Sequence, residues 1–300
     1  MGGRSAVYND DEPLMCGSFW PFDGCSSWCE AVEVLLTTQV LNGRWITLGE
    51  GVALNRHEPH SVVVTTKGSS RIAACHTISL PDNPPVRGSP PITNVHRIAL
   101  MPDVAARINA QLCDAARQKV CCKRDSGVLV SNVGGFHSTE TLITAVGRSL
   151  SEWMGEDLPG LCFEALAIIR EDALSSYDLT GWLNASHETD FNILHDHGSA
   201  AWSLVYFASS GRGAGSEDLS NWNSPDLLGG ELLLKTQLQP FTHRYAYLPI
   251  RPDPGVLWMF PGYLPHAVLP RRLQTPEEGL HTGALRVSAA FNATVKSQLI

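Results

Sequence analysis

The chain has 300 residues, of which 22 are basic and 30 acidic, so its net charge at pH 7 is −8. A protein that wraps nucleic acid or lies on an anionic membrane needs a surplus of Lys and Arg, so this charge argues against both partners. Hydrophobic residues make up 43% of the chain, which is enough for a large core and argues against disorder.

The cysteines and the N-terminal residues bear on the compartment. No run reaches the roughly 18 apolar residues of a membrane helix, and the first residues lack the basic and apolar segments of a secretory signal. The eight cysteines form no C-x-x-C pair and all lie before residue 163, unlike a disulfide framework. We therefore expect a cytoplasmic protein with reduced thiols and no membrane partner. The oligomeric state is not legible from the sequence.

The predicted elements change character along the chain. Helical spacing of apolar residues predicts helices at 28–41, at 101–120, and from Ser138 to Trp153. Five prolines between residues 81 and 91 predict a linker, and the glycine-rich segment 209–230 predicts a long loop.

After residue 159 the chain consists of short apolar runs separated by turn residues, as in an antiparallel double-sheet barrel, or jelly roll. The fold class is thus mainly β with flanking helices (α+β). The predicted strands are 161–170, 191–197, 202–207, 231–234, 245–248, 256–260, 264–269 and 285–291.

Histidines supply the first candidate site. His195 and His197 flank Asp196 on a predicted strand, where alternation sends both imidazoles to one face and the carboxylate to the other. Such a pair can hold a metal that imidazole favours, namely Zn, Cu, Fe or Ni. His266 follows an apolar strand and a Pro-Gly turn, a predicted hairpin that could carry it across the barrel. The alternatives are a surface pair of histidines and a core histidine at 266.

The last predicted strand supplies the second candidate site. Arg286 and Ser288 alternate onto one face of an otherwise apolar segment. A guanidinium directed into a barrel needs an anion, and a carboxylate is its natural bidentate partner. A structural salt bridge to Glu231 or Asp190 is the alternative.

Taken in order, these motifs resemble those of the Fe(II)/2-oxoglutarate oxygenases. The segment S-N-V-G-G-F-H-S at 131–138 is similar to an S-N-x-G-G-aromatic-x-S stretch in one branch of that superfamily. This chain is also similar to the same branch in five further segments, namely W-x-N (182–184), N-x-x-H-x-H (192–197), S-x-x-Y (203–206) and the closing segments 260–268 and 286–292. The resemblance runs from about residue 125 to residue 294.

The resemblance implies a double-stranded β-helix domain at 125–300, preceded by a helical or irregular extension at 1–124. It implies that Fe(II) binds to His195, His197 and His266. It also implies that the cosubstrate 2-oxoglutarate binds to Arg286, Ser288 and Tyr206. The enzyme would be an oxidoreductase that hydroxylates a peptide side chain, an amino acid or a small metabolite and releases succinate and CO2.

Two points stay open. The superfamily usually has Asp or Glu where His197 stands, so the third ligand could be His197, Asp196 on a bulged strand, or water. A cupin-like metal protein (an isomerase, another dioxygenase or a binding protein) also carries H-x-H and a distal His. Cupins usually add a Glu a few residues later, and 198–203 contains none. A metal-free jelly-roll scaffold is the third possibility.

Overall fold

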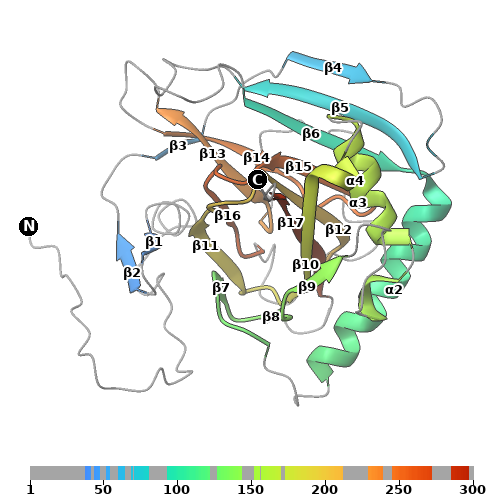
Figure 1. Cartoon of the computed structure of the whole chain (residues 1–300). Coiled ribbons are helices and arrows are strands. Elements are labelled where there is room, and N and C mark those ends of the chain that lie inside the picture. Colours follow the sequence, from blue (N-terminus) through green and yellow to red (C-terminus); the bar gives the residue numbers. More distant parts are fainter. Residues whose placement is uncertain are drawn as a thin grey trace, which may run out of the picture.

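Two mainly antiparallel sheets form the framework of the chain in a computed structural model (Figure 1). The structure describes residues 38–41, 44–47, 52–54, 60–64, 69, 71–80, 93–121, 127–143, 152–155, 157–169, 173–211, 229–238, 245–271 and 285–296.

The C-terminal half of the chain alternates between the two sheets. The larger sheet contains the neighbours β15-β12-β17-β10 and the smaller one β11-β16-β13-β14, all paired antiparallel. This four-plus-four arrangement is the double-stranded β-helix, as predicted. Its strands are β10 (Tyr177–Ser186), β11 (Phe191–His195), β12 (Trp202–Ser210), β13 (Leu232–Leu238), β14 (Tyr245–Ile250), β15 (Val256–Pro261), β16 (His266–Val268) and β17 (Arg286–Val295).

The first strand of this barrel is not the predicted one. Residues 161–170 were predicted as a strand, but most of them lie in helix α3 (Asp157–Ala167). The buried residues Leu158, Leu161, Cys162 and Ala165 recur at helical spacing, so the apolar run is one face of a helix. Strand β10 follows α3 after the short helix α4 (Ala173–Ser176) and was missed because polar residues interrupt its apolar pattern.

Both sheets continue into the N-terminal part of the chain. The order β4-β5-β6 extends the larger sheet beyond β15, while β2-β1 and β3 flank the smaller one. The description of residues 1–124 as helical or irregular missed these strands, and the division of the chain into two domains stays a prediction. The strands are β1 (Thr38–Leu41), β2 (Arg44–Thr47), β3 (Val52–Leu54), β4 (His60–Val64), β5 (Ile72–Leu80) and β6 (Thr93–Leu100).

Of the three predicted helices, the second is confirmed as α2 (Pro102–Cys121). The end of the first is wrong, because Thr38–Leu41 is strand β1; its remainder lies outside the described residues. The third is also wrong at both ends, where strand β9 (Thr141–Ile143) and the 3₁₀ turn η1 (Glu152–Met154) stand. The predicted linker and nearly all of the predicted loop, residues 212–228, also lie outside the described part.

Helices α2 and α3 cover the outer face of the larger sheet (Figure 1). Val104, Ile108 and Leu112 of α2 pack with Leu158 of α3 in one cluster that includes apolar residues of β10, β12 and β17. The inner face of the same sheet is therefore left to line the barrel. Among the described helices, none is both long and apolar enough to cross a membrane.

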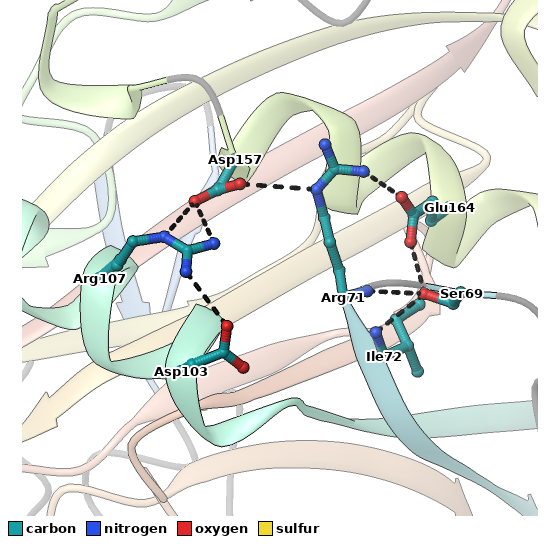
Figure 2. Close-up of polar contacts among 7 residues, drawn as sticks. All are labelled: Ser69, Arg71, Ile72, Asp103, Arg107, Asp157 and Glu164. Atoms are coloured by element: carbon teal, nitrogen blue, oxygen red, sulfur yellow. Dashed lines mark hydrogen bonds and ion pairs between the residues drawn. The ribbon is translucent and has the colours of Figure 1, made fainter.

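An ionic network joins these helices to the start of β5 in the larger sheet (Figure 2). Arg71, just before β5, pairs with Glu164 and Asp157 of α3, and Asp157 also pairs with Arg107 of α2. The hydroxyl of Ser69 donates to Glu164 at 2.7 Å. The network is only partly buried, so we assign it a structural role.

Candidate active site

Two of the predicted metal ligands face each other across neighbouring strands. His195 ends β11 and His266 begins β16, and the two residues are direct partners in the antiparallel register. Direct partners project to the same face of a sheet, so both imidazoles point in the same direction. Their ring centroids are 4.3 Å apart.

The third imidazole comes from a turn rather than from the strand. β11 ends at His195, and the N–H of His197 donates to the carbonyl of Gly262 at 2.9 Å. The ring of His197 then lies 5.0 Å from that of His266 and 5.3 Å from that of His195. The predicted hairpin that carries His266 is also wrong, because β15 belongs to the larger sheet and β16 to the smaller one.

The hydrogen bonds of the rings fix which nitrogen can bind a metal. Nδ1 of His195 donates to the carbonyl of Ile193 at 2.7 Å, and Nδ1 of His266 donates to that of Leu264 at 3.0 Å. A carbonyl only accepts, so Nδ1 carries the proton and the Nε2 lone pair is left for a ligand. Main-chain carbonyls often orient metal-binding histidines in this way.

The protonation state of the three rings also suits a cation. Burial lowers the pKa of His266 well below its usual value, and the neighbouring His195 and His197 lower it further. Burial likewise lowers the pKa of His195, and it lowers the pKa of His197 to about 3 with help from His195 and His137. All three rings are therefore neutral at physiological pH, the form that binds metal.

The carboxylate between the two histidines points elsewhere. Asp196 is exposed, and its Oδ1 accepts the N–H of Gly198 at 2.9 Å. Among the described residues, the group suited to a metal is His195, His197 and His266, with one ligand nitrogen from each within 4.8 Å of the others. Nitrogens bonded to one ion at about 2.1 Å lie at most about 4.2 Å apart, so the rings must close slightly around it. The donor set fits a first-row transition metal.

Arg286 crosses from the larger sheet to the smaller one. Its side chain is 4% exposed and donates through NH1 to the carbonyls of Gly230 and Leu269 and through NH2 to the hydroxyl of Ser186. Burial, together with the nearby Arg271, lowers the pKa of Arg286 to about 10, so it still carries its charge. Ser288 lies two residues further along the same face and is also buried.

Comparison with known proteins bears on this arrangement. Residues 180–292, which include all three histidines and Arg286, match the family described as "Putative 2OG-Fe(II) oxygenase". This segment carries the sequence pattern of the 2OG-Fe(II) oxygenases. The resemblance noted in the sequence is thereby confirmed.

Two solved structures are among those similar to this chain. A Pseudomonas putida prolyl-4-hydroxylase is 16% identical with a TM-score of 0.44, over 67% of this chain and 92% of that chain. A 2OG-Fe(II) oxygenase family oxidoreductase from Burkholderia pseudomallei is 13% identical with a TM-score of 0.35, over 63% of this chain and 90% of that chain. No curated protein matches the chain.

One predicted cosubstrate-binding residue lies elsewhere. Tyr206 was expected to bind the cosubstrate, but its hydroxyl donates to Oδ1 of Asn109 in α2 at 2.6 Å. Its ring belongs to the apolar cluster on the outer face of the larger sheet. Alternation along β12 sends Tyr206 outward and Phe207 inward, so this assignment is wrong.

Sequence reasoning missed three polar residues around the histidines. The hydroxyl of Ser131 lies 3.2 Å from Nε2 of His195, and Nδ2 of Asn292 lies 3.4 Å from Nδ1 of His197. The ring of His137 stacks on Trp182, which in turn lies 5.5 Å from the ring of His197. Ser131 and His137 belong to the S-N-V-G-G-F-H-S segment, which was recognised only as part of a resemblance.

Proposed function

We propose that this chain is an Fe(II)- and 2-oxoglutarate-dependent dioxygenase. One observation carries the proposal: three neutral imidazoles converge inside a double-stranded β-helix that also buries an arginine between its sheets. We assign His195, His197 and His266 as the iron ligands and Arg286 with Ser288 as the partners of the far carboxylate of 2-oxoglutarate. The family match to residues 180–292 supports both assignments.

The separation between the three-histidine group and Arg286 supports a dicarboxylate. The guanidinium of Arg286 reaches the carbonyl of Leu269 at 3.2 Å, and Leu269 lies three residues beyond His266, directly after the end of β16. A strand rises about 3.3 Å per residue, so these positions are about 10 Å apart along the strand. A five-carbon keto diacid, bound to a metal at one end and to the guanidinium at the other, would bridge a separation of this order.

Each residue then has a defined task. The carbonyls of Ile193 and Leu264 hold the tautomer of His195 and His266, so that both rings present a lone pair to the ion. Arg286 has three of its five N–H groups engaged by described residues, which leaves two to grip a carboxylate. When bound, Fe(II) with 2-oxoglutarate would supply oxidative decarboxylation coupled to C–H hydroxylation, with succinate and CO2 as products.

The proposal extends to the substrate and the location. A peptide side chain, an amino acid or another small metabolite fits a family that acts on C–H bonds. A cytoplasmic location agrees with the free thiols of Cys75, Cys113 and Cys162. A cupin-like metal protein would share the histidines but has no need of a buried arginine on the last strand.

Succinate release tests the proposal. The purified protein is incubated in air with Fe(II), ascorbate and 2-oxoglutarate, with and without pools of peptides and metabolites. We expect succinate that depends on Fe(II) and disappears in His266→Ala. A protein that has bound both iron and 2-oxoglutarate, yet forms no succinate under any of these conditions, would reject the activity.

A further inference from the structure

We infer that Ser131, oriented by Asn192, is a positioning residue of the metal centre that donates a hydrogen bond to an oxygen ligand on the ion. The inference rests on the proposed function and deepens it. It gives a role to the S-N-V-G-G-F-H-S segment, which lies before the family match.

Backbone pairing holds Ser131 beside the first histidine. Strand β7 (Asn132–Val133) pairs antiparallel with β11, so that Asn132 lies opposite Asn192. The N–H of Ile193 donates to the carbonyl of Ser131 at 2.9 Å. Ser131 is therefore fixed at the edge of the smaller sheet, with its side chain 6% exposed.

The hydrogen bonds give the hydroxyl a direction. Nδ1 of His195 already donates to Ile193, so Nε2 of the neutral ring can only accept. The hydroxyl of Ser131 must therefore donate to Nε2, at 3.2 Å, while its oxygen accepts from Nδ2 of Asn192 at 3.1 Å. The hydroxyl hydrogen thus points at the lone pair that would bind a metal.

An ion at Nε2 changes what this hydroxyl can do. The lone pair of His195 then bonds to the ion at about 2.1 Å and no longer accepts a hydrogen bond. On the line of that hydrogen bond the ion would lie only about 1 Å from the Ser131 oxygen, which is 3.2 Å from Nε2, so the hydroxyl must turn aside about its Cα–Cβ bond to admit the ion. A buried donor left beside a cation is satisfied by an oxygen bound to that cation, either water or the keto acid end of 2-oxoglutarate.

Paired binding measurements test this role, with Co(II) as the metal probe. The affinity for Co(II) is measured by equilibrium titration with the visible spectrum as a second readout. The affinity of the Co(II)-loaded protein for 2-oxoglutarate is measured by calorimetry. In Ser131→Ala, we expect Co(II) to bind as well as in the wild type, or up to about five-fold more tightly, because a competing hydrogen bond is lost. We expect 2-oxoglutarate to bind about five-fold more weakly.

Ser131→Thr keeps the hydroxyl and should bind both ligands like the wild type. Ser138→Ala removes a hydroxyl of the same segment that accepts the N–H of Leu183, and serves as a matched structural control. Should Ser131→Ala not fold, Ser131→Cys retains the volume with a weak donor and should show the same weakening of 2-oxoglutarate binding.

The outcomes separate the two claims. Unchanged 2-oxoglutarate affinity in Ser131→Ala, or a loss of Co(II) binding in that variant, overturns the role of Ser131. A wild-type protein that binds no Co(II) overturns the proposed function itself, and the inference with it.

Discussion

Replacing Arg286 by Ala is the sharpest perturbation of cosubstrate binding that the structure offers. Among the described residues, Arg286 donates to two main-chain carbonyls and to Ser186, which leaves two of its five N–H groups for a carboxylate. A hydrogen bond to a charged group contributes about 1.5–3 kcal/mol, so losing the pair costs at least about 3 kcal/mol of binding. At about 1.4 kcal/mol per tenfold, the Kd for 2-oxoglutarate should rise on the order of 100-fold.

Calorimetric titration of Co(II)-loaded protein with 2-oxoglutarate measures this Kd. Arg286→Lys keeps a charge without the planar pair of donors and should give an intermediate value. Arg107→Ala, on the outer helix α2, is the matched control and should bind like the wild type. Because Arg286→Ala also leaves the carbonyls of Gly230 and Leu269 without this donor, circular dichroism and Co(II) stoichiometry must show that it is folded. A folded Arg286→Ala whose Kd is within two-fold of the wild type would refute the reasoning.

Three further predictions concern regions around the site. Tyr206→Phe should lower the free energy of unfolding by about 1 kcal/mol, because the hydrogen bond to Asn109 is lost, but leave the Kd for 2-oxoglutarate unchanged. A higher Kd would show that Tyr206 takes part in cosubstrate binding. Arg71→Ala should lower the free energy of unfolding, measured by chemical denaturation, by about 1 kcal/mol, and by less in 1 M salt. The exposed Arg117→Ala should lower it by almost nothing, and equal effects of the two substitutions would show that the network does not stabilise the fold. Burial lowers the pKa of His96 to about 4, so as the pH falls below about 6.5 its imidazole takes up a proton in the unfolded chain but not in the folded protein. The free energy of unfolding should then drop by about 2 kcal/mol more in the wild type than in His96→Gln between pH 8 and pH 5, and parallel curves would contradict this.

The barrel strands were predictable because each is a short apolar run between turn residues. Seven of the eight predicted runs overlap an observed strand, from β11 to β17. The run 161–170 failed because a short, nearly continuous apolar segment fits a buried strand as well as a buried helix, and the structure has it as a helix packed against the sheet. Strand β6 pairs with β5 on one side and with β15 on the other, and the pairing with β15 is a long-range contact that no local pattern reveals.

The metal ligands were predictable by residue type but only partly by geometry. Alternation along a strand brought His195 and His197 to one face in the prediction, whereas the structure reaches the same result with a turn after His195. The partnership of His195 with His266 depends on the pairing of β11 with β16, which sequence spacing does not encode. Ser131 could not be placed, because its approach to His195 depends on the two-residue strand β7.

Metal stoichiometry tests the central claim most directly. Wild-type protein and the variants His266→Ala and His76→Ala are each dialysed against Co(II), and bound metal per chain is measured by mass spectrometry. His76 lies on β5, outside the three-histidine group, and is the control. With free Co(II) held at about ten times the wild-type Kd, the account predicts close to one ion per chain in the wild type and in His76→Ala, and about a tenth of that in His266→Ala, because losing a direct ligand should weaken binding by at least about 100-fold, the upper end of what the loss of an outer-shell partner costs. Full occupancy of His266→Ala with wild-type affinity would contradict it.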